Sequence, residues 1–164
     1  MKKIILSTVM IFSMVSLTAC GNTKVKSDNL DIELNLPGGN WESVADDANS
    51  YIVSDDKNMI SYNVTDVPNG YKMAATEEEL FNLLGEEVMA VSEIEDFNYT
   101  SNDDGTEQSL YYKQIIDLDN NISTVICHNT IKGNKLMTAT ATLVDGSPTE
   151  ITEIENIIKE NTVN

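Results

Sequence analysis

The hydrophobic pattern of this chain changes its period several times, and the order of those changes limits the folds that it can form. A strand with one buried face is predicted where four apolar residues alternate with polar ones: Leu30, Ile32, Leu34 and Leu36. Apolar runs at 51–53 and 59–64 flank a polar segment, which predicts a hairpin with a longer turn. Trp41 follows the Pro-Gly turn after the first strand, and we expect it to fill the core.

Two helices are predicted by capping patterns that precede apolar positions at three- and four-residue steps. Thr76 and Glu79 form the first capping box. The apolar stripe that follows comprises Leu80, Phe81, Leu84, Val88 and Val91. Gly85 lies inside this stripe and costs a helix about 1 kcal/mol relative to alanine. The second helix is expected to begin at Ser147-Pro148 and to end at Asn161. Its apolar stripe comprises Ile151, Ile154, Ile157 and Ile158.

Between the two helices the period changes to that of strands. Phe97 and Tyr99 alternate with polar residues, and three longer runs follow at 110–118, 122–131 and 136–143. The connections between these runs are short and rich in turn residues, so they predict a meander of antiparallel hairpins. Strands, a helix, more strands and a final helix favour the α+β class, with two main helices packed on an antiparallel sheet.

Charge sets the second constraint. The 164 residues include 27 acidic and 10 basic ones, the basic ones are all lysines, and the formal net charge is -17. Such a surface repels phosphate backbones, so nucleic-acid binding is not expected. With 41% hydrophobic residues, the chain is typical of a globular domain.

The amino-terminal segment resembles the export signal of bacterial lipoproteins. Lys2 and Lys3 precede an apolar run, which ends in the lipobox-like sequence Leu17-Thr18-Ala19-Cys20. The run is shorter than the roughly 20 residues that a spanning helix needs. The resemblance implies a signal peptide at 1–19 and a lipid on Cys20 that anchors the protein outside the bacterial cytoplasmic membrane. We expect a flexible tether at 20–29 and a single domain at 30–164.

The order of elements also resembles the Mog1/PsbP-like fold, an α/β/α sandwich. The matching features are a first strand that ends at Leu36-Pro37, Trp41 shortly after it, and the early hairpin. They continue with the helix from Thr76, the three-strand meander and the closing helix from Pro148. This resemblance implies a binding or accessory module rather than an enzyme.

The chain offers few candidates for catalysis. If Cys20 carries lipid, Cys127 has no intramolecular disulfide partner, and we expect it to be buried. His128 is the neighbour of Cys127, but adjacent residues of a strand point to opposite faces, so the two cannot form a dyad. One histidine and one free cysteine cannot supply a structural zinc site. No catalytic residue, metal site or cofactor is predicted. Tyr111 and Tyr112 should also face opposite ways, so that one of them can be exposed.

Acidic residues leave two possibilities open. A calcium-loop spacing begins at Asp117 and continues to Ser123, but Ile122 occupies the glycine position and His128 the position of the bidentate glutamate. A hairpin turn explains this run better. Weak calcium binding at Asp55-Asp56 or Asp103-Asp104 stays open, as does glycoside chemistry by a carboxylate pair.

These observations favour a membrane-anchored, non-enzymatic module that meets a protein partner through a sheet edge or a loop face. Two alternatives remain. One is a hydrolase that uses acidic residues, and the other is a carrier with a small-ligand pocket between helix and sheet.

Overall fold

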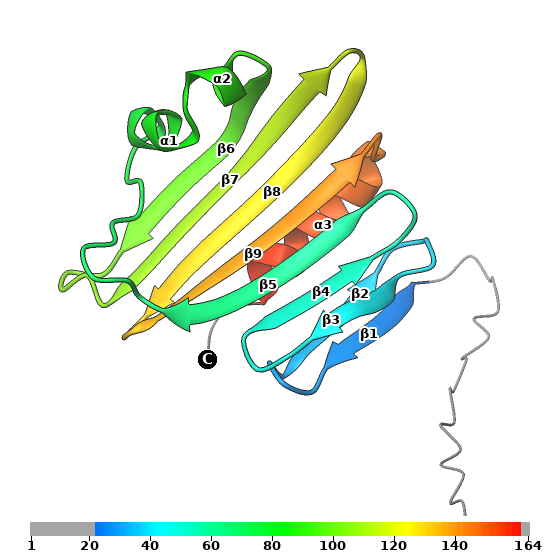
Figure 1. Cartoon of the computed structure of the whole chain (residues 1–164), viewed down its shortest axis with the longest axis horizontal. Helices are drawn as coiled ribbons and strands as arrows, with labels where there is room; N and C mark the ends of the chain where they lie inside the picture. The colour runs from blue at the N-terminus through cyan, green and yellow to red at the C-terminus, as the bar shows by residue number, and fades with distance from the viewer. Residues whose placement is uncertain (1–21, 162–164) are drawn as a thin grey trace, which may run out of the picture.

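A seven-stranded antiparallel sheet forms the centre of the computed structural model, which describes residues 22–161 (Figure 1). Its strands are β3 (Glu42–Asp46), β4 (Ser50–Ser54), β5 (Met59–Asp66), β6 (Ser92–Ser101), β7 (Glu107–Leu118), β8 (Asn121–Lys132) and β9 (Lys135–Val144). Their spatial order is β3-β4-β5-β9-β8-β7-β6. The pairing of β7, β8 and β9 confirms the predicted meander, and the pairing of β4 with β5 confirms the predicted hairpin.

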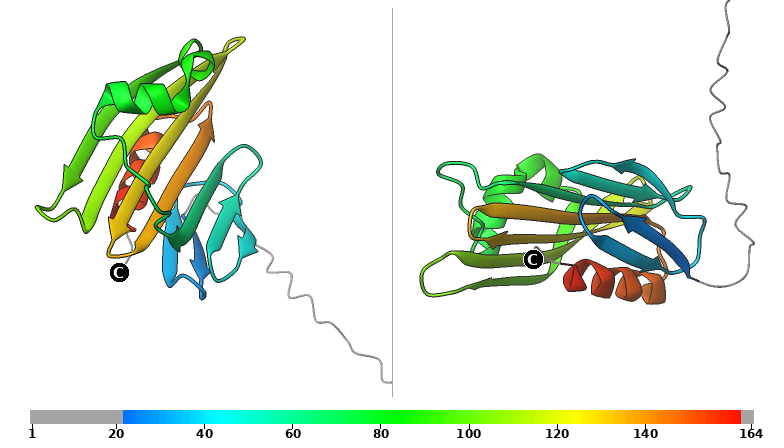
Figure 2. Two further views of the ribbon diagram at one scale, coloured as in Figure 1. Left: turned by 60° about the vertical axis from the view of Figure 1, so that its left-hand side comes forward. Right: turned by 90° about the horizontal axis from the view of Figure 1, so that it is seen from below.

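The two faces of the sheet are covered by different elements. On one face lie α3 (Pro148–Glu160) and a separate hairpin of β1 (Thr23–Ser27) and β2 (Ile32–Leu36). On the other face, α1 (Glu77–Leu84) and α2 (Glu86–Met89) lie over the β6–β7 side (Figure 2). This arrangement confirms the predicted α+β class, with helices on an antiparallel sheet.

The main core lies between the sheet and the layer that α3 and the β1–β2 hairpin form. Its fully buried members include Leu34, Leu36, Tyr51, Ile60, Tyr62, Ile126, Leu143, Ile154 and Ile158. Trp41 is buried as predicted, and its indole N–H donates to the Pro37 carbonyl at 3.3 Å. A second, smaller core under α1 contains Leu80, Leu110, Tyr112, Cys127 and Leu136.

Both tyrosines of the Tyr111-Tyr112 pair are buried, although their opposite directions allowed one of them to be exposed. The two rings do point to opposite faces of β7. The sheet is covered on both sides at this strand, because Tyr111 belongs to the main core and Tyr112 to the core under α1. A tyrosine on either face therefore loses its contact with water.

The tether predicted at 20–29 is wrong for most of its length, because β1 (Thr23–Ser27) pairs with β2 along its whole length. Ser27 is fully buried. Its hydroxyl donates to Asp46 Oδ1 at 2.6 Å and accepts from the Leu30 N–H at 3.0 Å. β1 contains few apolar residues and forms a strand because its backbone pairs with the free edge of β2. The predicted signal peptide, Cys20 and Gly21 lie outside the described residues.

The predicted helix from Thr76 to Val91 is interrupted at Gly85, which adopts φ 86° and ψ 155°. Thr76 caps α1 as predicted, since its hydroxyl accepts from the Glu79 N–H at 3.2 Å. The Gly85 N–H donates to the Phe81 carbonyl and closes α1, after which the short helix α2 begins. The turn at Gly85 changes the direction of the chain, so the predicted apolar stripe does not face the core along its whole length.

The closing helix is formed as predicted. Ser147 caps it through a hydrogen bond from the Glu150 N–H, Pro148 lies in the first turn, and Asn161 is the C-cap. Ile154 and Ile158 are fully buried against the sheet. Like β1, β3 (Glu42–Asp46) had no sequence signal. It contains an irregularity between Ser43 and Ala45 and forms an edge of the sheet.

Candidate functional site

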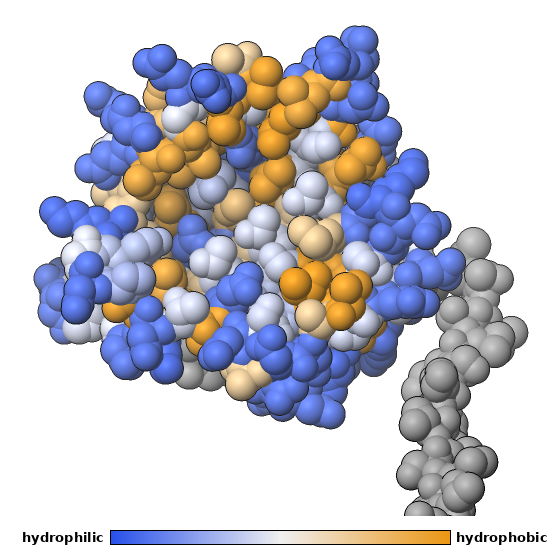
Figure 3. Space-filling model, viewed as in Figure 1, coloured by the Kyte–Doolittle hydropathy of each residue, from blue (hydrophilic) through white to orange (hydrophobic). Residues whose placement is uncertain are grey.

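Four large apolar side chains of the α1–α2 region are exposed, and we call them the α1–α2 surface. They are Phe81 (41% exposed), Leu83 (68%), Val88 (39%) and Val91 (36%). Figure 3 shows a band of hydrophobic side chains over the part of the molecule where α1 and α2 lie. Three of the four, Phe81, Val88 and Val91, belong to the apolar stripe of the predicted helix. Of this stripe, only Leu80 is buried, and Leu84 is partly buried against the core under α1.

Acidic side chains accompany this surface. The first turns of α1 and α2 carry Glu77, Glu78, Glu79, Glu86 and Glu87, and neither helix has a basic residue in its last turn. The α1–α2 surface is therefore both apolar and strongly negative. A partner of matching chemistry presents apolar side chains among basic ones.

Hydrogen bonds fix the end of α2 to the sheet. The Ser92 hydroxyl donates to the Val88 carbonyl at 2.8 Å and accepts from the Gln114 side-chain amide at 2.8 Å. The Asp117 N–H donates to the Val91 carbonyl at 2.9 Å. Because these contacts hold α2 against β7, the apolar side chains are presented by a fixed part of the fold.

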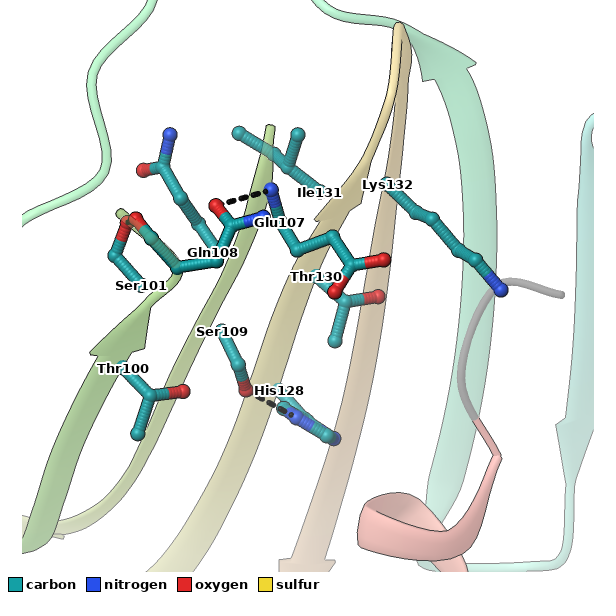
Figure 4. Close-up of a pocket in the computed structure, with 10 residues that line it drawn as sticks. Thr100, Ser101, Glu107, Gln108, Ser109, His128, Thr130, Ile131 and Lys132 are labelled. Atoms are coloured by element: carbon teal, nitrogen blue, oxygen red, sulfur yellow. Dashed lines mark hydrogen bonds between the residues drawn. The ribbon is translucent and has the colours of Figure 1, made fainter. Parts of the chain in front are cut away.

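The opposite face of the sheet carries a polar trough where α3 does not cover β6, β7 and β8. Two adjoining hollows of about 560 and 490 Å³ share Thr100, Ser109 and His128 among their lining residues. Thr100, Ser109 and Thr130 lie side by side on the three strands, because Ser109 is the register partner of both of the others. Figure 4 shows Ser109 directed toward His128 on the neighbouring strand.

Ser109 and His128 form a hydrogen-bonded pair in this trough. Ser109 Oγ lies 2.9 Å from His128 Nε2, and His128 Nδ1 lies 3.2 Å from the Ile158 carbonyl oxygen. A carbonyl oxygen can only accept, so Nδ1 carries the proton and Nε2 accepts from the Ser109 hydroxyl. Burial lowers the pKa of His128, an effect that the Ile158 carbonyl opposes and Lys159 reinforces. The imidazole is therefore neutral at pH 7.

Charged groups at the edge of the trough are paired with one another. Lys159 Nζ lies 2.5 Å from Glu155 Oε1 and 3.9 Å from the centre of the Tyr111 ring. Lys113 donates to Asp96 Oδ2 at 2.6 Å. The hydrogen bond from Lys113 lowers the pKa of Asp96. For Glu155, burial alone would raise the pKa, but the hydrogen bond from Lys159 helps to hold it below its usual value.

Among residues 22–161, every carboxyl group with a shifted pKa is shifted downward: Asp46, Asp96, Asp104 and Glu155. Glycoside hydrolysis by a carboxylate pair needs one acid whose pKa is raised, so that it is protonated when it meets the substrate. None of these four carboxyl groups has the raised pKa that the acid of such a pair needs.

Cys127 is buried, as predicted, on the face of β8 opposite to His128. Burial raises the pKa of its thiol, and Sγ lies 3.9 Å from Thr140 Oγ1. The expectation that Cys127 and His128 do not form a dyad is confirmed. Within the described part of the chain, no three side chains of the His, Cys, Asp and Glu types gather as a metal site would require.

The segment with calcium-loop spacing is a tight hairpin, as expected. Asp119 and Asn120 occupy the turn between β7 and β8 with φ values of 55° and 66°. Positive φ at both central residues is the signature of the turn that matches the twist of paired strands. Of the other acidic pairs, Asp55 accepts from the Lys57 and Asn58 N–H groups, and Asp104 accepts from Thr106.

The sequence reasoning missed Ser109 and Thr130 as neighbours of His128. A signal was present, because a two-residue turn at Asp119-Asn120 fixes the register of β7 and β8. That register pairs Ser109 with Thr130 and Tyr111 with His128 on one face of the sheet. What no pattern showed is the contact between His128 and the last turn of α3.

Comparison with solved structures identifies the fold. The chain is similar to the solution structure of cyanobacterial PsbP (CyanoP) from Synechocystis sp. PCC 6803. The TM-score is 0.53 at 13% sequence identity, over 94% of this chain and 99% of that one. The domain thus has a PsbP-like fold, in agreement with the resemblance seen in the sequence. At this identity the similarity concerns the fold alone.

Two other solved structures are more distant. A crystal structure from Bacteroides thetaiotaomicron VPI-5482 has a TM-score of 0.42 at 18% identity, over 84% of this chain and 47% of that one. The protein of unknown function PA94 from Pseudomonas aeruginosa has a TM-score of 0.44 at 10% identity, over 85% and 92%. No protein-family model and no curated protein matches the chain. Between residues 22 and 161, none of the helices has the length and apolar character to cross a membrane.

Proposed function

We propose that this chain is a lipid-anchored accessory module on the extracytoplasmic side of a bacterial membrane, and that it binds a protein partner through the α1–α2 surface. The exposure of Phe81, Leu83, Val88 and Val91 carries the proposal. Adjacent exposed apolar side chains mark interaction sites in soluble domains. Binding is sufficient for this role, and it requires no reaction by the domain.

The chemistry of the surface selects the partner. The glutamates of α1 and α2 favour a protein segment that carries lysine or arginine around its apolar side chains. A second copy of the chain would bring the same glutamates into the interface and would be repelled. An anionic lipid surface would be repelled for the same reason.

The anchor proposed at Cys20 suits this role. β1 begins at Thr23, three residues after Cys20, and that stretch spans at most about 11 Å. A lipid on Cys20 would therefore hold the β1–β2 hairpin close to the membrane. The α1–α2 surface lies at the far side of the molecule from this hairpin (Figure 1). It would consequently face away from the bilayer, where a partner can reach it.

The two alternatives receive less support. A hydrolase that uses carboxylates needs a raised pKa, whereas the shifted carboxyl groups of the described residues all have lowered ones. A small-ligand carrier needs an enclosed apolar pocket. The trough on the α3 face is instead open and lined largely by polar side chains.

Site-specific crosslinking in the native membrane tests the proposal. A photo-crosslinking residue replaces Leu83 in the lipid-anchored protein, and the adducts are identified by mass spectrometry. We expect one dominant protein adduct, attached at a segment rich in basic residues, that is lost when Phe81 and Val88 are replaced by serine.

Val44 provides the matched control, because it is 63% exposed but lies on β3, away from α1 and α2. The same residue placed at Val44 should not give this adduct. Identical adducts from both positions, or no adduct from Leu83, would show that the α1–α2 surface is not the docking site.

A further inference from the structure

We infer that Ser109 is an activated hydroxyl that accepts an acyl group from an activated ester, with His128 as its general base. This inference is independent of the proposed docking role, since Ser109 and the α1–α2 surface lie on opposite faces of the sheet. It concerns the polar trough, to which no role has been given above.

The first support is the geometry of the pair. Ser109 Oγ lies 2.9 Å from His128 Nε2, within the distance at which a base takes the proton of a nucleophile. The Ile158 carbonyl holds the other ring nitrogen at 3.2 Å and so fixes the tautomer in which Nε2 is free to accept. A third group that orients the base is the arrangement found in serine nucleophiles generally.

The second support is the position of that third group. Ile158 lies in the last turn of α3, which ends at Glu160. The carboxyl end of a helix carries a partial negative charge, and this charge favours a positive imidazolium nearby. The helix end thereby takes over, in part, the role of the acidic residue in a catalytic triad. The neutral form of His128 is the ground state, because the residue is only 6% exposed.

The third support is an unused hydroxyl beside the nucleophile. Thr130 is the register partner of Ser109 on β8 and lines the same hollow. It is 7% exposed, and its Oγ1 has no hydrogen-bond partner among the described residues. Buried hydroxyls normally find a partner. The Thr130 oxygen is closed off from the trough in the structure, so the Thr130 side chain would rotate to donate to the charge that develops on a bound ester.

Ser109 Oγ attacks the ester carbonyl carbon while its proton passes to His128 Nε2, which gives a tetrahedral oxyanion beside Thr130. The oxyanion collapses, the bond to the leaving alkoxide or phenoxide breaks, and His128 returns the proton to that leaving oxygen. The products are an ester on Ser109, a free alcohol or phenol, and a neutral His128. No oxidant, reductant or metal is required.

The test uses the full chain with p-nitrophenyl acetate as the probe, and a fluorophosphonate as a second one. Peptide mass spectrometry measures the rate at which each serine is modified. General-base assistance typically contributes at least about 100-fold. We therefore expect Ser109 to react more than tenfold faster than Ser101. Ser101 lines the same hollow but donates only to the Asn102 carbonyl, so it serves as the internal control.

Two substitutions separate the parts of the mechanism. H128Q should reduce the reactivity of Ser109 to that of Ser101. T130V preserves the shape of the side chain and should slow the reaction about tenfold through loss of the oxyanion donor. Far-UV circular dichroism and thermal melts establish that each variant is folded.

If H128Q does not fold, the inference is tested by the pH dependence of the rate at which Ser109 is modified in the unsubstituted protein. The rate should be level near pH 7 and should fall in acid as His128 takes up a proton. A Ser109 that reacts no faster than Ser101, or a rate in folded H128Q equal to that of the unsubstituted chain, would overturn the inference. A rate that shows no fall in acid at any pH where the protein remains folded would do the same.

Discussion

The side-chain amide of Asn58 donates to the carboxylate of Glu150 at 3.2 Å, and this contact joins the β4–β5 turn to the first turn of α3. The same Asn58 side chain also accepts from the Val144 N–H at 3.0 Å, at the end of β9. Asn58, which is only 7% exposed, therefore joins the β4–β5 turn to two neighbouring segments that lie 86 and 92 residues further along the chain.

Replacing Asn58 by alanine should lower the free energy of unfolding by about 1–3 kcal/mol, since the Val144 N–H would lose its acceptor in this part-buried hydrogen bond. Chemical denaturation followed by circular dichroism measures the change. Asn29 is exposed and makes one long hydrogen bond to the Asp46 carbonyl, so N29A should change stability by less than about 0.5 kcal/mol. Equal effects of the two substitutions would show that the Asn58 contacts do not hold the three segments together.

Stability in acid should depend on Ser27. Its hydroxyl hydrogen bond lowers the pKa of Asp46 below the ordinary value of 3.8. A lowered folded-state pKa stabilises the fold at pH values above 3.8, and this contribution is lost as the pH falls through the folded-state pKa. We expect S27A to be less stable than the unsubstituted protein at pH 7, and the difference to shrink below pH 4. Acid titration of both proteins by tryptophan fluorescence checks this, and a difference that grows in acid would contradict it.

The effect of G85A on stability should have opposite signs in a continuous helix and in a helix that is broken at Gly85. In a continuous helix, G85A would stabilise the protein by about 1 kcal/mol. In the structure Gly85 has φ 86°, a region that disfavours residues with a Cβ atom, although nothing lies within 4 Å of the place where that atom would be. The substitution should therefore destabilise the protein by about 1–2 kcal/mol. A thermal melt that shifts upward would mean that α1 and α2 are one helix.

Replacing Cys20 by serine should release the protein from the membrane fraction while its domain remains folded. The proposed lipid requires the thiol, whereas the described contacts begin with β1 at Thr23. Cell fractionation followed by immunoblotting gives the distribution, and limited proteolysis reports on folding. Unchanged membrane retention of C20S would refute the anchor.

Local sequence patterns were sufficient to predict the elements that are specified by interactions between near neighbours in the sequence. The meander, the early hairpin and the α3 cap follow from strand periodicity, short turns and the Ser147–Glu150 box, and these interactions form between near neighbours in sequence. The burial of Trp41 and Cys127 followed from residue type and from the vulnerability of an exposed thiol. The resemblance to the PsbP-like fold followed from the order of these elements.

Tertiary structure decided the rest, because it depends on contacts between distant segments. β1 forms because it pairs with β2 and because Ser27 donates to Asp46. Its own sequence is typical of a flexible tether. The turn at Gly85 leaves Phe81 and Val88 in solvent, although their spacing is that of a buried stripe. The Ser109–His128 pair could be deduced from strand register, but the Ile158 carbonyl that orients His128 is supplied by a helix 30 residues further along the chain. Periodicity predicts which face of an element a residue occupies, whereas the contacts of that face depend on how distant segments pack.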